Sequence, residues 1–432
     1  MTIESLYQIF KQCTSVITDS RIKEKNALFF ALKGENFDGN KFVSQALENG
    51  CKYAVVDDEN LSDTPNCIYV PDTLKTLQEL ARHHRKTFKI PVIGITGTNG
   101  KTTTKELTAA VLASKYKIWN TQGNFNNHIG VPLTLLSMPE NTEIAIIEMG
   151  ASHKGEIDFL CNIALPDFGL ITNVGKAHLE GFGSFEGVME TKSELYRYIK
   201  SNGSLCFLNT DNNYLKSLIK DCKYVGYGSS DTSLVTGRNV KSEPFLEFEW
   251  SEKESKIGNK VKTNLTGIYN FENALSAICI ATYFNVPDHL INNALSEYTP
   301  HNNRSQLINT KYNKVLLDAY NANPDSMKVA LQNFNKMPDI HKVLILGEMN
   351  ELGLVSYQEH AILLEQINTM DFDDCFLIGN EFKSFQSFPK NIKWFESVGY
   401  LSAYLQKEPI TDKLILIKGS RSNRLENLVE IL

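Results

Sequence analysis

The chain has 432 residues, of which 42% are hydrophobic and 22% are charged, a composition typical of globular proteins. Because this length exceeds what one compact core organises, we expect two to four domains. The net charge of −6 provides no basic surface for nucleic acid, and no apolar run reaches the roughly 18 residues that span a bilayer.

The first residues, MTIESLYQIFKQC, lack the basic region and the apolar run of a secretion signal. The eight cysteines are scattered and form no C-x-x-C pair, which argues against zinc and against a disulfide framework. Both observations predict a protein of the reducing cytoplasm.

Residues 1–88 predict a small α/β domain. Apolar segments at 27–32 and 53–56 favour strands, and 42–48 favours the one helical stretch that we expect here. Pro91 interrupts a helix and begins an extended segment, so the first domain boundary is predicted near residue 88.

Residues 89–300 alternate short β-rich runs with helical periods. We expect strands over 92–96, 144–149, 168–174 and 204–208, and helices over 101–114, 185–200 and 270–284. Apolar strands alternating with helices predict a mostly parallel sheet covered on both faces. Residues 233–266 alternate in polarity and are rich in charge, which predicts an antiparallel edge.

Residues 301–432 begin a third series of strands and helices after Pro300. We expect its strands over 314–319, 342–347, 375–378 and 413–418. The sequence therefore predicts an α/β protein of three domains, with limits at 1–88, 89–300 and 301–432.

The segment from Val92 to Thr104, VIGITGTNGKTTT, places a glycine-rich turn between a predicted strand and a predicted helix. The common phosphate-binding pattern G-x-x-x-x-G-K-[ST] has a glycine where this chain has Ile95. Gly97 and Gly100 still let backbone N–H groups approach an anion, and the helix N-terminus adds partial positive charge. An ordinary strand-to-helix turn is the alternative reading.

After the turn, Lys101 can bridge the β- and γ-phosphates of a nucleotide, and Thr102 can place its hydroxyl on Mg²⁺. The residues predicted to bind ATP are Gly97, Thr98, Asn99, Gly100, Lys101, Thr102 and Thr103. The form T-G-T-N-G-K-T-T-T resembles the loop of the Mur ligase and folylpolyglutamate synthetase superfamily. Members of that superfamily form amide bonds by activating a carboxylate with ATP.

This resemblance spans nearly the whole chain. It implies a small N-terminal α/β domain that binds a UDP-sugar-peptide, a central ATP-binding domain with a mostly parallel sheet of the P-loop type, and a C-terminal Rossmann-like domain. Ser20 and Arg21 lie in a segment that resembles the UDP-binding region. The stretch N-x-N-N-x-x-G-x-P resembles the part that faces the sugar-peptide, which assigns Asn124, Asn126 and Asn127 to the substrate. A polar surface loop is the alternative for both segments.

Glu148 ends an apolar strand and His178 follows another, where a carboxylate beside a phosphate loop can hold Mg²⁺. A solvated rim residue and a structural histidine are the alternatives. The resemblance implies that both side chains, with Thr102, help to bind magnesium. Related ligases carry a carbamylated lysine at the position of Lys192, whose alternative is a solvent-facing lysine. Since only a neutral lysine reacts with CO₂, that modification requires a site that lowers the lysine pKa.

Gly267–Leu275 opens a predicted helix, and Asn270 is a suitable N-cap. The resemblance implies instead that Asn270 and Asn273, one helical turn apart, contact the adenine. It also implies that Arg304, at the start of the third domain, faces the nucleotide and the reaction intermediate.

The segment Asp318–Met327, DAYNANPDSM, ends a predicted strand and begins a helix that Asn323 or Asp325 can cap. A purely structural turn is one reading. The pattern D-x-Y-N-A-N-P-x-S also resembles the branch of the superfamily that adds D-Ala-D-Ala to UDP-N-acetylmuramoyl-tripeptide, and the D-N-P-R diaminopimelate signature is absent.

From this branch we expect Asp318 and Asn321 at the nucleotide, and Asn323 at the substrate. Lys418 and Ser420 follow the last predicted strand, where a cation and backbone amides can hold a carboxylate or phosphate. The predicted catalytic residues are Lys101, Lys192, Arg304 and Asp318.

The resemblance thus implies an ATP- and Mg²⁺-dependent ligase that joins D-Ala-D-Ala to UDP-N-acetylmuramoyl-tripeptide through an acyl phosphate. We expect a monomer without membrane insertion and without nucleic acid. The sequence leaves open whether the third residue of the tripeptide is diaminopimelate or lysine, and whether Lys192 is carbamylated.

Three other functions would share part of this sequence pattern. Another amide ligase of the superfamily would share the loop, but neither the UDP-type N-terminal region nor the 318–327 turn would be expected. A simple ATPase would share Lys101 and Thr102 and need no amine acceptor. A catalytically inactive binding module would be expected to have lost Lys101, Glu148 or His178, and all three are present.

Overall fold

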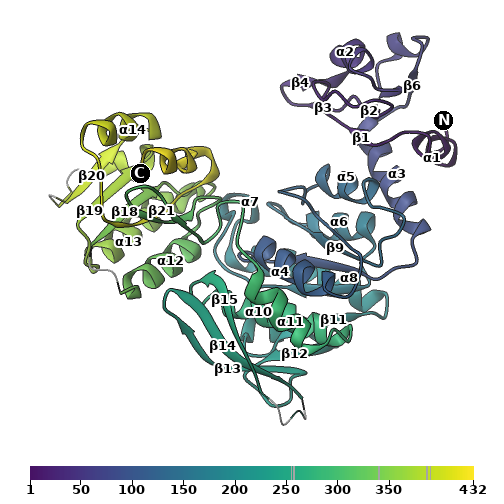
Figure 1. Cartoon of the computed structure of the whole chain (residues 1–432). Coiled ribbons are helices and arrows are strands. Elements are labelled where there is room, and N and C mark those ends of the chain that lie inside the picture. The colour runs from purple at the N-terminus through teal and green to yellow at the C-terminus, as the bar shows by residue number, and fades with distance from the viewer. Residues whose placement is uncertain (254, 256–257, 339–340, 386–387, 390) are drawn as a thin grey trace.

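The structure is a computed structural model that describes residues 1–253, 255, 258–338, 341–385, 388–389 and 391–432. Within these residues, a four-stranded, a nine-stranded and a six-stranded sheet follow one another along the chain, each with its own helices (Figure 1). The predicted α/β class is confirmed. The domain limits near residues 88 and 300 stay predictions.

The first sheet is parallel, with the order β1-β2-β5-β6. Its strands are β1 Val16–Ile17, β2 Leu28–Phe30, β5 Tyr53–Val56 and β6 Cys67–Tyr69, beside a hairpin of β3 Lys33–Gly34 and β4 Phe37–Asp38. Its helices are α1 Ile3–Phe10, α2 Val43–Glu48 and α3 Thr73–Thr87.

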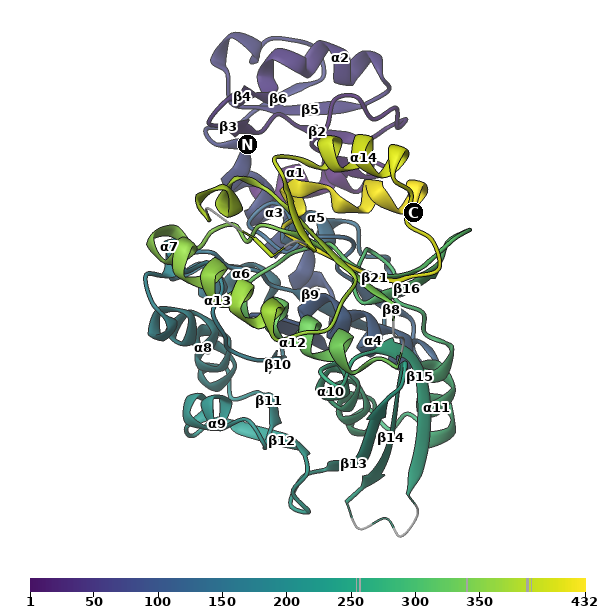
Figure 2. The same ribbon diagram turned by 90° about the vertical axis from the view of Figure 1, so that its left-hand side faces the viewer.

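The expectation of one helix in this region is wrong, because α1 and α3 accompany α2. In α3, Leu77, Leu80 and His84 are buried at helical spacing, and Asp72 caps the helix by accepting a hydrogen bond from the backbone N–H of Lys75. The buried face of α3 packs on α1 and also on helices of the central region, so α3 joins the first sheet to the second (Figures 1 and 2).

The nine-stranded sheet has the order β15-β14-β13-β12-β11-β10-β7-β9-β8. Its parallel part comprises β7 Val92–Thr96, β8 Ile118–Asn120, β9 Ile144–Glu148, β10 Phe168–Ile171, β11 Leu205–Asn209 and β12 Lys223–Gly228. Its antiparallel edge comprises β13 Val235–Ser242, β14 Phe245–Glu252 and β15 Asn259–Thr266. The predicted antiparallel segment at 233–266 is therefore confirmed.

Helices cover both faces of this sheet. One face carries α4 Lys101–Ala113, α10 Asn270–Tyr283 and α11 Asp288–Glu297. The other carries α5 Gly130–Leu136, α6 Glu156–Ala164, α7 Leu179–Phe182, α8 Phe185–Ser201 and α9 Asn213–Ile219.

Strand β7 explains the missing glycine of the phosphate-loop pattern. Ile95 is fully buried on the face covered by α4 and α10, whereas Val92 belongs to the core on the opposite face. Because Ile95 is still part of the strand, its side chain fills the core and does not line the loop.

The six-stranded sheet has the order β16-β17-β21-β18-β19-β20. Its strands are β16 Gln306–Asn309, β17 Lys314–Asp318, β18 Lys342–Gly347, β19 Asp374–Ile378, β20 Ile392–Phe395 and β21 Leu414–Lys418. All pairs are parallel except β16 with β17. Helices α12 Pro324–Lys336 and α13 Ser356–Asn368 cover one face, and α14 Val398–Lys407 covers the other.

The loops at the carboxyl ends of β7 and β17 meet between the second and third sheets, where one cavity of about 800 Å³ is lined by residues of both. Asp325 of α12 and Glu359 of α13 contact Lys176 of the central region at this junction. Within the described residues, no helix combines the length and apolar character needed to cross a bilayer.

Candidate active site

The glycine-rich turn after β7 depends on close packing at two glycines. Gly97 has a φ of +148°, and a side chain there would collide with the hydroxyl of Thr172. Gly100 has a φ of +78° and lies directly against the side-chain amide of Asn273. Only glycine meets both demands without strain, and the first turn of α4 therefore opens toward the cavity.

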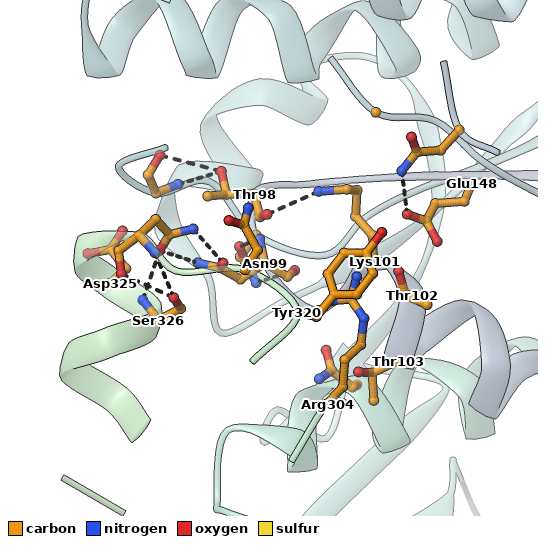
Figure 3. Close-up of a pocket in the computed structure, with 18 of the residues that line it drawn as sticks. Thr98, Asn99, Lys101, Thr102, Thr103, Glu148, Arg304, Tyr320, Asp325 and Ser326 are labelled. Atoms are coloured by element: carbon orange, nitrogen blue, oxygen red, sulfur yellow. Dashed lines mark hydrogen bonds between the residues drawn. The ribbon is translucent and has the colours of Figure 1, made fainter. Parts of the chain in front are cut away.

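Lys101 lies back over this turn. Its Nζ donates to the carbonyl oxygen of Gly97 at 2.8 Å and to that of Thr98 at 3.1 Å (Figure 3). Burial lowers the pKa of Lys101 to about 8, and the charge of Glu148 partly opposes this shift. The ammonium group thus stands at the mouth of the loop, where a phosphate oxygen can replace the carbonyl oxygens.

Glu148 is 1% exposed at the end of β9. Its Oε1 accepts a hydrogen bond from Nδ2 of Asn126 at 2.8 Å, whereas its Oε2 is buried without a hydrogen-bond partner. An unpartnered carboxylate oxygen in a cavity is costly unless a cation or water binds it, so this atom fits a hard cation.

His178 also lines the cavity, and Oε2 of Glu351, from the loop after β18, lies 2.5 Å from its Nδ1. The backbone of His178 has a φ of +50°, a conformation that a non-glycine residue rarely adopts. Glu351 belongs to the third sheet's region, so this contact spans the two regions.

Lys192 is 2% exposed on α8, and its Nζ lies 5.4 Å from the ring centroid of Phe182. It does not line the cavity. Burial and then the charge of Lys101 lower the pKa of Lys192 to about 7. A solvent-facing lysine is therefore excluded, and burial shifts this amine toward the neutral form that reacts with CO₂.

Asn270 and Asn273 lie together at the start of α10 and line the cavity. Asn273 donates to Oδ1 of Asn270 at 2.9 Å and accepts from the hydroxyl of Thr104 at 3.1 Å. The N-cap position belongs to Tyr269, so the reading of Asn270 as an N-cap is wrong.

Arg304, from the third region, lies over the ring of Tyr320, with its Cζ 3.7 Å from the ring centroid (Figure 3). Its Nε is buried without a hydrogen-bond partner. Nearby, Asp318 forms an ion pair of 2.6 Å with Lys418, which is 2% exposed. The cavity thus has cations on both sides, Lys101 from the central region and Arg304 from the third.

Three further contacts hold the third region against the central region. Nδ2 of Asn323 donates to Oδ1 of Asn99 at 2.8 Å. The carboxylate of Asp325 accepts from the backbone N–H of Lys176 at 2.7 Å, and the side chain of Lys176 forms an ion pair of 2.8 Å with Glu359. The two halves of the cavity are therefore docked in this structure.

Comparison with known proteins follows the same three regions. The Mur ligase family, catalytic domain, matches residues 12–85; the Mur ligase middle domain matches 95–281; and the Mur ligase, glutamate ligase domain, matches 303–421. The UDP-N-acetylmuramoyl-tripeptide–D-alanyl-D-alanine ligase of Bacillus subtilis is 38% identical over 96% of this chain and 92% of its own. The chain belongs to the Mur ligase family.

Other relatives agree with this assignment. The Escherichia coli protein of the same name is 33% identical over 97% of this Mur ligase and 93% of its own chain. The crystal structure of MurF from Acinetobacter baumannii has a TM-score of 0.86 at 28% identity, covering 99% and 97% of the two chains. MurF from Thermotoga maritima, in complex with ADP, has a TM-score of 0.84 at 27% identity, covering 98% and 97%.

Most of the site residues expected from the sequence line the cavity of this Mur ligase. They are Thr98, Asn99, Gly100, Lys101, Thr102, Thr103, Asn126, Asn127, Glu148, His178, Asn270, Asn273, Arg304, Asp318, Asn321, Asn323 and Lys418. These residues come from both the central and the third region, so the site is shared between two sheets.

Five expected residues besides Gly97 lie away from the cavity lining, including Lys192 and the exposed Asn124. Ser20 donates to Oε1 of Gln45 at 2.9 Å, and Arg21 pairs with Asp19 at 2.7 Å, both in the first region. The hydroxyl of Ser420 accepts from the backbone N–H of Asn350 at 3.0 Å, so it supports the loop after β18.

Sequence reasoning missed the residues that join the two halves. Lys176 and Glu351 received no role from the sequence, and Asp325 was considered only as a helix cap. Each of these residues follows the end of a strand, and in sheets of this type the carboxyl ends of the strands form the ligand site. That position is the signal that could have identified them.

Proposed function

We propose that this Mur ligase joins D-Ala-D-Ala to the tripeptide of UDP-N-acetylmuramoyl-tripeptide, with cleavage of ATP to ADP and phosphate. The observation that carries the proposal is the juxtaposition of the ATP-type loop with the D-A-Y-N-A-N-P turn, through Asn99 and Asn323. The relatives of this name, similar over nearly their full length, support the same reaction.

For ATP, the backbone N–H groups of 97–103 and the N-terminus of α4 would hold the phosphates. Lys101 would exchange its two carbonyl partners for phosphate oxygens, which requires its charged form. Asn270 and Asn273 would contact the adenine from the start of α10.

For magnesium, the free Oε2 of Glu148 supplies the observation of fit. Within the described residues no cluster of three or more His, Cys, Asp or Glu side chains could hold a metal. We infer that Glu148, Thr102 and His178 would hold Mg²⁺ together with phosphate oxygens, with Lys192 contributing when carbamylated. When bound, the metal neutralises phosphate charge.

In the reaction, the terminal carboxylate of the tripeptide attacks the γ-phosphorus of ATP, and the bond to the bridging oxygen of ADP breaks. The dipeptide amine then attacks the acyl-phosphate carbonyl, and phosphate leaves as the amide forms. Lys101 and Arg304, which both line the cavity, would stabilise the negative charge that develops in both steps. Asp318 would hold Lys418 near the incoming dipeptide carboxylate.

The positions of the residues that would contact the two substrates follow from the same cavity. Asn323 precedes α12 beside the expected dipeptide position, with Ser420 supporting the adjacent loop, and Asn321 would contact the nucleotide. Asn126 and Asn127 line the opposite side, toward the UDP-sugar-peptide, and Asn124 precedes them. Ser20 and Arg21 would contact the UDP group from the first region. We further propose that the enzyme acts as a monomer in the cytoplasm, where ATP and the UDP-linked precursor are available.

The direct test measures phosphate release by the purified full-length protein with ATP, UDP-N-acetylmuramoyl-tripeptide and D-Ala-D-Ala. Separate assays use the diaminopimelate and lysine forms of the tripeptide. We expect release only with all three substrates, loss of release in Lys101→Ala, and normal release in Lys117→Ala, an exposed lysine beyond α4. Phosphate release without the dipeptide would support a simple ATPase, and no release with either tripeptide would overturn the proposal.

A further inference from the structure

Cys206 and Cys222 form a close pair of thiols outside the active site. Their Sγ atoms lie 3.4 Å apart, and both side chains are buried. Cys206 belongs to β11, and Cys222 immediately precedes β12, the neighbouring parallel strand. Among the described residues, which include all eight cysteines, no other two thiols lie within hydrogen-bond distance.

The two thiols differ in acidity. The hydrogen bond that Cys222 shares with Cys206, and then the charge of Lys200, lower the pKa of Cys222, although burial opposes this shift. Burial, followed by the neighbouring Cys222, raises the pKa of Cys206 far above its usual value. Cys222 is therefore the group that becomes a thiolate, the reactive form, while Cys206 keeps its proton.

Cys222 also lies nearer to solvent than its partner. It follows α9 in a short turn, and its neighbours Lys220, Asp221 and Lys223 are exposed. Cys206 is completely buried within strand β11 of the sheet. A small oxidant would thus meet Cys222 first and find Cys206 directly behind it.

We propose that Cys206 and Cys222 are a redox site at which a peroxide converts two thiols into a reversible intramolecular disulfide. The Cys222 thiolate attacks one peroxide oxygen, the O–O bond breaks, and the sulfenic acid and one water form. The sulfur of Cys206 then attacks that of Cys222, and the S–S bond forms as a second water leaves. The dithiol loses two electrons and two protons, and one peroxide is reduced to two waters.

The geometry permits this step with a small movement, because a disulfide needs its sulfur atoms about 2.05 Å apart. The cross-link would join residues 16 positions apart, which restricts the unfolded chain. Since neither cysteine lines the cavity, we expect oxidation to raise the thermal midpoint while the turnover of ATP is retained. This inference does not depend on the proposed function.

The test oxidises the reduced full-length protein with hydrogen peroxide, alkylates the remaining thiols in denaturant, and maps the peptides by mass spectrometry without reductant. We expect a linked peptide pair containing Cys206 and Cys222, lighter by two hydrogens, and six alkylated thiols in place of the eight of the reduced chain. Dithiothreitol should restore all eight.

Variants make the test specific. Cys222→Ser should abolish the linked peptides, whereas Cys161→Ser, at another buried cysteine, should retain them. The wild-type peptide map decides the question even where a core variant unfolds. Eight free thiols after peroxide treatment, or oxidation of Cys222 without a link to Cys206, would overturn the proposal.

Discussion

Asn99 and Asn323, 224 residues apart in sequence, form a direct hydrogen bond of 2.8 Å between the nucleotide loop and the turn before α12. Oδ1 of Asn323 at the same time accepts from the backbone N–H of Ser326 at 2.9 Å and caps α12 (Figure 3). One side chain therefore fixes both the start of a helix and the distance between the two halves of the cavity.

A comparison of two variants should separate the capping of α12 from the contact with Asn99. Asn323→Ala removes the cap and the bond to Asn99, whereas Ser326→Ala removes only the other half of the capping box. We expect each variant to lower the free energy of unfolding by about 0.5–2 kcal/mol. Only Asn323→Ala should lower kcat, by roughly ten- to hundred-fold. This variant loses the contact that positions the nucleotide loop relative to the turn before α12. Phosphate release at saturating substrate measures this, and an equal loss of kcat in both variants would contradict it.

Replacing Glu148 should act through the metal. Glu148→Gln keeps the size of the side chain but removes the negative charge of the carboxylate to which the unpartnered Oε2 belongs. We expect the Mg²⁺ concentration for half-maximal ATP turnover to rise by roughly 10–100-fold. Glu143→Gln, at an exposed residue just before the same strand, is the matched control. A magnesium titration of both variants gives the answer, and an unchanged midpoint in Glu148→Gln would exclude the assignment.

The buried Lys192 should make stability depend on pH. Its pKa is lowered to about 7 in the folded protein, whereas a lysine in an unfolded chain titrates near about 10.4. Between these values the unfolded state binds more protons, so the free energy of unfolding rises with pH in this window. Below about pH 7 the full cost of burying the cation is present.

Urea denaturation at pH 7 and pH 9, in buffer free of carbon dioxide, measures this effect. The gain in stability at pH 9 should be smaller in Lys192→Met than in the wild type, because the variant lacks the titrating group. Equal gains would be inconsistent with the lowered pKa. In ¹³C-labelled bicarbonate, the wild type should show a carbamate signal that the variant lacks.

Arg85 should anchor the first region to the second. Its guanidinium, buried at the end of α3, donates to Asp167 at 3.0 Å and to the carbonyl oxygen of Ala164 at 3.2 Å. Arg85→Ala removes the donor to the carbonyl oxygen of Ala164, whereas Asp167 keeps the backbone N–H of Val92 as a donor and lies partly in water. We therefore expect a loss of about 2–3 kcal/mol, mainly from the buried acceptor and the lost ion pair. Arg82→Ala, an exposed residue one turn earlier, should change stability by less than about 0.5 kcal/mol. Urea denaturation compares the two, and similar values would refute the anchoring role.

Local pattern predicted much of this protein. The alternation of apolar strands with helices gave β7, α4, β9 and α8 within a few residues of their observed bounds. The edge strands β16 and β20 were missed because each is short and only partly buried. The helix α3 has buried residues at helical spacing and an N-cap residue, so its sequence did indicate a helix. The interpretation of the sequence missed it.

The sequence by itself determined the nucleotide loop, because the spacing of Gly97, Gly100 and Lys101 is a local property of one strand, one turn and one helix. Only the tertiary structure decided that Asn99 meets Asn323, that His178 meets Glu351, and that Cys206 meets Cys222. Those pairs depend on which strand ends the sheet order and the docking of two sheets bring together. The spacing of residues along the chain carries no direct record of that arrangement.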